Sequence, residues 1–299
     1  MSALKILVAG RNGQVGFELA RSLLPLGDVA APSRSEFDFN EPRTIERTVR
    51  EIAPHIIVNA AAYTAVDAAE SDPATAERVN GTAVGVLAEE ARKIGSLVVH
   101  YSTDYVFDGK KPSPYVEADT TGPINVYGRS KLAGEELLRQ SSAQHLILRT
   151  SWVYGARGRN FLRTILKLSR ERESLRVVDD QQGAPTWARS IADATAHILH
   201  HNPAATFREI ESGTVNLTST GSTTWYGFAV AAISEWRALE REKGSSECKI
   251  VPIPTSEYPT PAARPRNSRL DGSELPRRFG VVMPDWQVAV KRCLEEIAS

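Results

Sequence analysis

The chain has 299 residues, of which 41% are hydrophobic and 24% charged, and its 36 basic residues equal its 36 acidic ones. This is the composition of a folded globular protein, and zero net charge excludes a strong general attraction to nucleic acid or anionic membranes. No apolar run approaches the roughly 20 residues that cross a bilayer. The two cysteines, Cys248 and Cys293, fit no metal or redox spacing and indicate a reducing compartment. We therefore expect a soluble cytoplasmic protein with no membrane or nucleic-acid partner.

Short β-branched apolar runs alternate with helical patterns through the first half of the chain. Strands are expected over residues 5–10, 28–34, 55–62, 96–104 and 145–152, and helices over 16–27, 44–54, 73–95 and 128–142. Apolar strands in regular alternation with helices form parallel sheets that are covered on both faces. The sequence therefore predicts an α/β fold with a Rossmann-like, doubly wound parallel sheet.

The second half is less regular. A helix over 187–201 and a strand over 214–219 are expected to return to the sheet, whereas the proline-rich segment 253–268 cannot form a regular element. We predict that residues 1–155, with 187–220 returning to them, form the sheet domain. Residues 156–186 and 221–299 are expected to form mainly a smaller, discontinuous C-terminal lobe.

Glycines follow the first predicted strand directly. Gly10, Gly13 and Gly16 have the spacing GxxGxxG at the start of the first helix. Glycine lets the backbone turn sharply and approach a pyrophosphate, while the helix N-terminus offers N–H groups and a partial positive charge. This position predicts a dinucleotide site contacted by Gly10, Asn12, Gly13, Gln14, Val15 and Gly16. The alternative is a glycine-rich turn that serves packing alone.

The end of the second strand indicates which dinucleotide binds. An acidic residue there would bind the ribose 2′-hydroxyl of NAD, but Ser33 and Arg34 occupy the position. Because arginine matches phosphate geometry, the sequence favours NADPH, with NADH as an alternative cofactor and a solvated surface charge as the other interpretation of Arg34. Asp38 and Phe39 are expected to flank the adenine.

A tyrosine and a lysine lie four residues apart in "VYGRSK". Tyr127 and Lys131 share a helix face if this segment is helical. A tyrosine titrates near about 10, and a neighbouring ammonium favours its phenolate. We predict that Lys131 and the positive nicotinamide of the oxidised cofactor both lower the pKa of Tyr127, and that Lys131 binds the nicotinamide ribose. Thr103, at the end of its strand, is expected to donate a hydroxyl to a carbonyl oxygen that is being reduced.

These motifs resemble those of the extended short-chain dehydrogenase/reductases, whose YxxxK matches "YGRSK" and whose serine/threonine strand matches "STD". Six longer segments resemble the dTDP-4-dehydrorhamnose reductase family almost end to end: "NAAAYTAVDAAE", "VHYSTDYVFDG", "NVYGRSKLAGE", "RTSWVYG", "DDQQGAPT" and "YPTPAARPRNSRLD". The resemblance implies reduction of the 4-keto group of dTDP-4-dehydro-L-rhamnose with NAD(P)H. This is the last step of dTDP-rhamnose synthesis for cell-surface polysaccharides such as the O-antigen of lipopolysaccharide.

The same resemblance assigns roles to individual residues. It implies that Tyr127 gives its proton to the sugar O4, that Lys131 holds the ribose, and that Thr103 polarises the carbonyl. It implies further cofactor contacts from Ala62, Tyr63 and Thr64. It implies substrate contacts from Thr103, Asp104, Trp152, Ala184, Pro185, Arg264, Asn267 and Ser268. Core packing remains the alternative for Trp152, and a solvated basic linker the alternative for the segment around Arg264.

Some members of this family are described as binding magnesium between subunits through acidic side chains. Glu18 and Glu296 match two such positions, but Arg189 stands where another acid would align. Because a cation beside Mg²⁺ is unfavourable, we predict no metal in the catalytic site and doubt a metal at the interface of a homodimer.

Two alternative functions remain open at this point. A nucleotide-sugar epimerase or dehydratase would use the same fold, although dehydratases show an Asp-Glu pair where this chain has "STDYV". The other is a regulatory subunit that binds the cofactor without catalysis, like the homologues that accompany methionine adenosyltransferase.

Overall fold

The computed structural model describes residues 4–200, 210–239 and 248–299. Its centre is a six-stranded sheet in the order β10-β5-β4-β3-β1-β2, and every neighbouring pair is parallel. The strands are β1 (Lys5–Ala9), β2 (Asp28–Ala30), β3 (Ile56–Asn59), β4 (Leu97–Thr103), β5 (His145–Thr150) and β10 (Gly213–Asn216). The predicted doubly wound parallel sheet is confirmed, and the strand expected over 214–219 returns to its edge beside β5.

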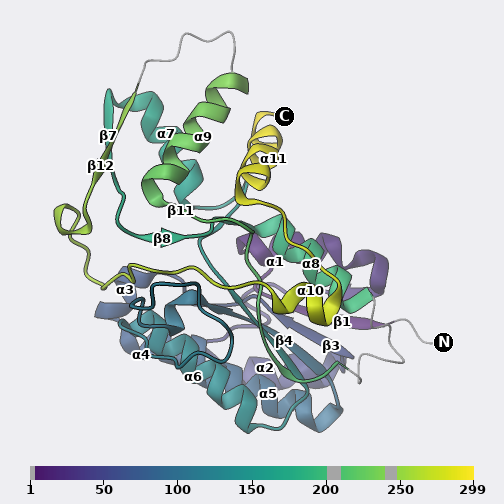
Figure 1. Ribbon diagram of the computed structural model, residues 1–299. Helices are drawn as coiled ribbons and strands as arrows, with labels where there is room; N and C mark the ends of the chain where they lie inside the picture. Colours follow the sequence, from purple (N-terminus) through teal and green to yellow (C-terminus); the bar gives the residue numbers. More distant parts are fainter. Residues whose placement is uncertain (1–3, 201–209, 240–247) are drawn as a thin grey trace.

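Helices cover both faces of this sheet (Figure 1). One face packs against α1 (Gln14–Ser22), α8 (Ala188–His200) and α10 (Glu274–Phe279). The other packs against α2 (Pro42–Ile52), α5 (Ala83–Ile94) and α6 (Val126–Gln140). All seven residues of β4 are buried, which is why the central strands are apolar on both sides rather than alternating.

The helix expected over 73–95 is divided into three pieces. It consists of α4 (Pro73–Glu77), a π-helical turn over Arg78–Thr82 and α5, which ends at Gly95 with a φ of 69°. A short helix, α3 (Val66–Ser71), precedes it. The hydrophobic period did not predict the π turn, because one extra residue changes the hydrogen-bonding pattern without interrupting the apolar run.

A smaller lobe lies beyond the carboxyl edge of the sheet (Figure 1). Its helices α7 (Phe161–Glu171), α9 (Trp225–Leu239) and α11 (Trp286–Ala298) share one apolar cluster. Beside them, β7 (Ser174–Val178) pairs in parallel with β12 (Lys249–Ile253). Two short pairs join β8 (Gln182–Gly183) to β11 (Thr223–Thr224) and β6 (Val153–Tyr154) to β9 (Thr186–Trp187).

The division of the chain between sheet domain and lobe stays a prediction. Leu275, Val281 and Met283 pack in the core of the main sheet with α8, although they fall within the range 221–299 assigned mainly to the lobe. The helix predicted over 187–201 is present as α8, and residue 201 lies outside the described residues.

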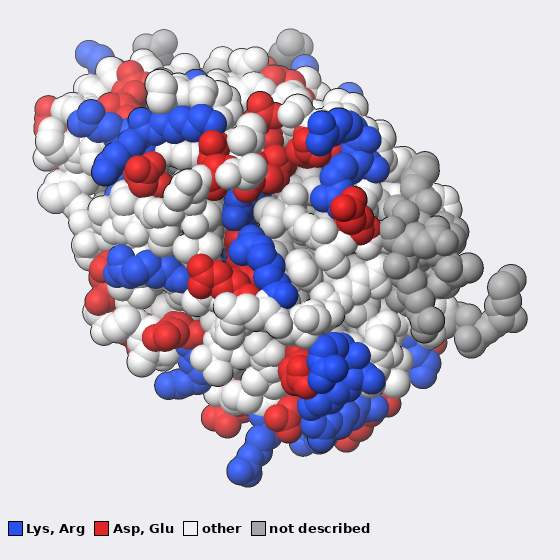
Figure 2. Space-filling model, turned by 60° about the horizontal axis from the view of Figure 1, so that its bottom comes forward, with Lys and Arg blue, Asp and Glu red and all other residues white. Residues whose placement is uncertain are grey.

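Charged side chains of both signs are mixed over the face in Figure 2, as expected for zero net charge. Among the residues that the structure describes, no helix combines the length and apolar character needed to span a bilayer.

Candidate active site

The glycine-rich turn fits tightly between β1 and the loop after β3. Gly10 has a φ of 81°, and a Cβ built on it would lie 2.7 Å from the carbonyl of Ala60. A Cβ on Gly16 would lie only 2.1 Å from the Gly10 oxygen. Only glycine tolerates these contacts. The N-cap of α1 is Gly13, which has no side chain to cap the helix, so the first N–H groups of α1 can bind a phosphate.

The other residues predicted in this cradle differ in environment. Asn12 is exposed, whereas Val15 packs against the sheet core. The Gln14 amide oxygen accepts a 2.8 Å hydrogen bond from Asn160, the N-cap of α7. Gln14 therefore connects the cradle to the lobe, which the local motif did not predict.

The segment after β2 contains side-chain interactions that the sequence did not predict. Glu36 folds back and accepts hydrogen bonds from the Ser33 N–H and hydroxyl at 2.8 and 2.6 Å, and these bonds lower its pKa. Arg34 is 74% exposed and lies 3.6 Å from Asp38. Arg11 reaches the same place and donates to the Ala31 carbonyl at 2.9 Å. Two guanidinium groups and two carboxylates, those of Glu36 and Asp38, thus gather where a 2′-phosphate would bind.

Sequence reasoning missed both Arg11 and Glu36 here. The only available signals were a basic residue directly after Gly10 and an acid three residues after Ser33. Phe39, predicted to flank the adenine, is 4% exposed and belongs to the sheet core, with its ring edge-on to Phe37. Its ring therefore supports the loop from within.

The loop after β3 contains the predicted cofactor residues Ala62, Tyr63 and Thr64, and the π-helical turn holds it in place. Asn80 in this turn accepts from the Tyr63 N–H at 2.8 Å and donates to the Tyr63 carbonyl at 3.0 Å. It also donates to the Ser130 hydroxyl on α6 at 3.0 Å. Asn80 therefore connects the cofactor loop to the helix that contains Tyr127, a role for which the sequence gave no signal.

Tyr127 and Lys131 lie on the first turns of α6, as predicted from their spacing. The helix begins where the Asn125 side chain accepts from the Gly128 N–H at 2.8 Å. Lys131 is 2% exposed, and its ammonium nitrogen donates to the Tyr101 carbonyl at 2.6 Å. Thr103 ends β4, where its hydroxyl donates to Asp104 at 2.9 Å and accepts from the Tyr105 N–H at 3.2 Å.

The electrostatics of the pair differ from the prediction. Burial raises the pKa of Tyr127 above its usual range and the Asp104 carboxylate raises it further, while a hydrogen bond with Thr103 lowers it in part. Burial also lowers the pKa of Lys131 to about 8. The acidification expected from Lys131 is therefore wrong in this arrangement, because desolvation of the phenol dominates and Lys131 makes no resolved contribution. The part expected from the oxidised nicotinamide stays a prediction. A protonated phenol is, however, the form that can donate a proton.

Two residues predicted to contact substrate lie next to this group. Asp104 is 2% exposed, and burial raises its pKa to about 6, against the hydrogen bonds of Ser268 and Thr103 that lower it. Asp104, directly after β4, thus lies close to Ser268 of the segment 264–269, more than 150 positions away in sequence, and its Oδ2 has no hydrogen-bond partner among the described residues.

Trp152, Ala184 and Pro185 form a packed wall. Trp152 has a φ of 46°, and its ring stacks on Trp225 at a centroid distance of 3.6 Å. Ala184 and Pro185 are buried, and the Ala184 carbonyl accepts from Ser151 at 3.0 Å. Trp152 is therefore held in place by packing against Trp225, and its contact with substrate stays a prediction.

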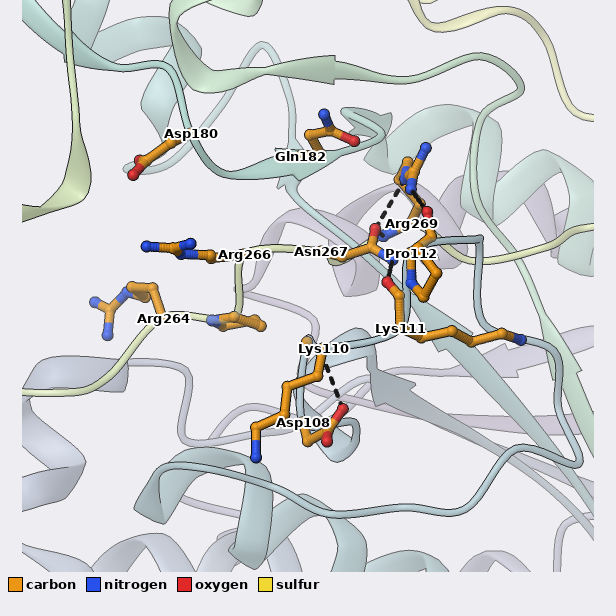
Figure 3. Close-up of a pocket in the computed structure, with 12 residues that line it drawn as sticks. Asp108, Lys110, Lys111, Pro112, Asp180, Gln182, Arg264, Arg266, Asn267 and Arg269 are labelled. Carbon is orange, nitrogen blue, oxygen red and sulfur yellow. Dashed lines mark hydrogen bonds between the residues drawn. The ribbon is translucent and has the colours of Figure 1, made fainter.

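Basic side chains gather in a pocket of about 520 Å³ between the main domain and the lobe. Figure 3 shows Arg264 and Arg266 extending to the same side of their segment, with Lys110 below them. Arg264 also pairs with Asp67 at 2.9 Å. It lines a second cavity of about 600 Å³ that includes Tyr105 and Trp225. Guanidinium and ammonium groups in such a place suit a diphosphate.

Asn267 has a different place in the pocket. Its amide donates to the carbonyls of Lys111 and Ser113 at 2.7 and 2.8 Å, and its oxygen accepts from Arg269 (Figure 3). Both the nitrogen and the oxygen of this amide are bonded to protein groups. Asn267 therefore connects the segment 264–269 to the loop of residues 111–113, and these two segments shape the pocket.

Arg189 lies between the two carboxylates considered for a metal. It pairs with Glu18 at 3.5 Å and with Glu296 at 3.3 Å. The Arg189 guanidinium therefore already occupies the place between these two carboxylates. Within residues 4–200, 210–239 and 248–299, no three His, Cys, Asp or Glu side chains gather in a way that could hold a metal ion.

Known proteins match this chain over nearly its whole length. A family model described as the RmlD substrate binding domain matches residues 4–299. A dTDP-4-dehydrorhamnose reductase of Burkholderia thailandensis is 54% identical over 99% of this chain and 100% of its own length. That of Escherichia coli K12 is 47% identical over 98% of each chain.

A solved structure gives the same result. The crystal structure of a dTDP-4-dehydrorhamnose reductase from Bacillus anthracis in complex with NADP has a TM-score of 0.90 and 32% identity, and covers 99% of this chain and 100% of that one. Because the family model and these relatives match nearly the whole chain, the chain belongs to the RmlD substrate binding domain family of dTDP-4-dehydrorhamnose reductases.

Proposed function

We propose that this protein reduces the C4 carbonyl of dTDP-4-dehydro-L-rhamnose with NADPH and forms dTDP-L-rhamnose for cell-surface polysaccharide. The observation that carries the proposal is the position of Tyr127 on the first turn of α6, close to Thr103 at the carboxyl end of β4 and one helical turn before the buried Lys131. Ligands bind at this edge in open α/β sheets. The full-length relatives named above support the choice of substrate.

The residues of this chain have distinct roles in the reaction. Bound NADPH supplies the hydride to C4. The Tyr127 phenol, which burial keeps protonated, gives its proton to O4. The Thr103 hydroxyl donates to the same oxygen once it leaves Asp104. Lys131 binds the nicotinamide ribose and returns a proton to Tyr127.

The cofactor is held by the glycine cradle and by Arg11 and Arg34 at the end of β2. Both arginines have donors that can turn to a phosphate. Arg34 is 74% exposed beside Asp38, and Arg11 donates to a neutral carbonyl. A 2′-phosphate gives both guanidinium groups an acceptor, which supports NADPH over NADH. The Glu36 carboxylate repels a 2′-phosphate and so weakens the preference for NADPH. We therefore expect NADH to be used as well, at a lower rate than NADPH.

The nucleotide-sugar occupies the two cavities beside Arg264. Arg264 and Arg266 bind the diphosphate, and the ring of Trp225 in the larger cavity offers an apolar face to the base. Asp104, Trp152 and Ser268 are proposed to contact the sugar. Ala184 and Pro185 are proposed to shape the wall behind it.

We also propose that the protein works in the cytoplasm, which the unpaired, buried Cys248 and Cys293 support. The homodimer stays a prediction, and sedimentation or light scattering measures it directly.

The test is NADPH oxidation by the purified chain in the presence of dTDP-4-dehydro-L-rhamnose, repeated with NADH. We expect Tyr127→Phe to lose at least about 100-fold in kcat, because a general acid contributes that much or more, while it still binds NADPH. The matched control is Tyr154→Phe, since Tyr154 is a buried tyrosine whose hydroxyl has no hydrogen-bond partner among the described residues. Full turnover in Tyr127→Phe, or none in the unchanged protein, would refute the proposal.

A further inference from the structure

A buried histidine lies directly beside Lys131. The Nε2 of His100 on β4 is 3.3 Å from the Lys131 ammonium nitrogen, and its Nδ1 is 3.0 Å from the side-chain nitrogen of Asn59. His100 and Asn59 lie opposite each other on β4 and β3. All three side chains are at most 2% exposed. A polar group in such a place is costly unless every hydrogen bond has a donor and an acceptor.

The amide orientation of Asn59 is fixed by its other partner. The Asn59 oxygen accepts from the backbone N–H of Ala61 at 3.0 Å. A flipped amide would place an NH₂ group against this N–H, donor against donor. The nitrogen of the amide therefore points to His100 and donates to Nδ1.

This donor decides the tautomer of His100. The ring is neutral, because burial and the nearby Lys131 lower its pKa well below 6.5. A neutral imidazole carries one hydrogen, and Nδ1 is already an acceptor, so the hydrogen is on Nε2. This N–H faces Lys131. An ammonium group can only donate, whereas a neutral amine has a lone pair that accepts.

We propose that His100 is a positioning residue whose Nε2–H donates to the neutral amine of Lys131 and so stabilises Lys131 after it has passed on its proton. This inference rests on the proposed function. Tyr127 gives its phenolic proton to the carbonyl oxygen, and the phenolate takes a proton from the Lys131 ammonium. The resulting amine accepts the hydrogen bond of His100 and regains a proton from water. The Tyr101 carbonyl accepts from Lys131 in both states.

The other charged groups around Lys131 do not replace this bond. Glu135, one turn later on α6, favours the ammonium. Its carboxylate is bound by Arg149 on β5 at 2.9 and 2.7 Å and by Arg139 at 2.6 Å. Its charge is thus compensated by two guanidinium groups. His145 on β5 lowers the pKa of His100 in the same direction as burial and Lys131, and it is the smallest of these three causes.

The tautomer can be measured without substrate. Nitrogen-15 NMR of the full-length protein with labelled histidine should show the His100 hydrogen on Nε2 at pH 7. In Asn59→Asp the carboxylate accepts from both Ala61 and Nδ1–H, so the hydrogen should move to Nδ1 and leave Nε2 as an acceptor for the ammonium. A wild-type hydrogen on Nδ1, or a charged ring, would overturn the proposal.

The second readout is the pH profile of kcat. The wild-type rate should fall above about pH 8, where Lys131 loses its proton. In Asn59→Asp the Nε2 lone pair of His100 can accept from the Lys131 ammonium, and in His100→Gln the amide oxygen can. Both acceptors favour the charged form of Lys131, so the fall in rate should move upward by about one pH unit or more. His145→Gln is the control, because His145 is also buried but bonds the Ala143 carbonyl instead of Lys131. An unmoved profile in both variants contradicts the inference.

The two proposals fail differently. If the expected tautomer is found but no NADPH is oxidised with the keto sugar, the hydrogen bond stands and the assigned reaction is wrong. If the reaction proceeds and the hydrogen is on Nδ1, the reaction stands and the role of His100 is wrong.

Discussion

The glycine cradle and the basic segment 264–269 are both expected to bind phosphate, and they do so in opposite ways. The cradle uses backbone N–H groups within a few residues of each other and allows no side chain at Gly10 or Gly16. The basic segment uses guanidinium side chains and depends on partners far away in sequence, such as Asp67 and Asp104. The first site is therefore limited by backbone space and the second by charge pairing.

The largest effect is expected when the cradle loses its backbone space. Gly16→Ala would place a Cβ 2.1 Å from the Gly10 oxygen, so the turn has to open and the Kd for NADPH should rise at least about 100-fold, or about 3 kcal/mol. Calorimetric titration measures this. Gly272→Ala is the control, because a Cβ there meets nothing within 4 Å. Equal affinity in the two variants would show that the cradle does not depend on close packing.

A change in the basic segment should weaken binding of the nucleotide-sugar and leave binding of NADPH almost unchanged. Arg264→Gln removes a charge-assisted bond, typically about 1.5 to 3 kcal/mol, so KM for the nucleotide-sugar should rise about 10- to 100-fold. The Kd for NADPH should change less than about twofold.

Arg277→Gln is the matched control for that variant, since Arg277 is 75% exposed and pairs with Glu274. Steady-state kinetics at saturating NADPH separate the outcomes. If Arg264→Gln weakens NADPH instead, the two phosphate sites are not separate.

Asp104, which lies close to the basic segment, should make stability depend on pH. Its folded pKa of about 6 lies above the ordinary value of 3.8, so the folded state binds more protons than the unfolded one between these values. Stability therefore falls as pH rises from about 4 to 6. Asp104→Asn should be more stable above pH 6 by about 2 to 3 kcal/mol at most, although it should lose activity.

Thermal unfolding at pH 4 and pH 7.5 tests this prediction. The gain in Tm should be about 5 °C at pH 7.5 and close to zero at pH 4. Asp119→Asn is the comparison, because Lys111 lowers the pKa of Asp119, so this variant should lose stability at neutral pH. A gain for Asp104→Asn that is the same at both pH values would argue against a raised pKa.

The smallest effect is expected at the exposed end of the cofactor site. Arg34→Ala removes a guanidinium that is 74% exposed, and exposed ion pairs contribute about 0 to 1 kcal/mol. The Kd for NADPH should therefore rise only about threefold to fivefold, and that for NADH should not change. A loss as large as that of Gly16→Ala would mean that this side chain, rather than the backbone, dominates binding.

Much of the main domain was predictable from local patterns. The strands of the first half and the return of β10 to β5 are where the apolar runs indicated, and the spacing of Tyr127 and Lys131 placed both on one helix. The π turn, the parallel pairing of β7 with β12 and the helices α7, α9 and α11 were not predicted. These depend on contacts between distant segments, for which periodicity gives no signal.

The sequence by itself determined the parallel sheet, the glycine cradle and the residue types that carry the chemistry, because each of these is specified by neighbouring residues. Only the tertiary structure decided their protonation and partners. It placed Tyr127 and Lys131 where desolvation, rather than a charge effect of one on the other, sets the direction of their pKa shifts, and it placed His100, Asn80 and Arg264 against groups on other elements. A pKa or an ion pair depends on burial and on neighbours in space, and the order of residues in the chain specifies neither directly.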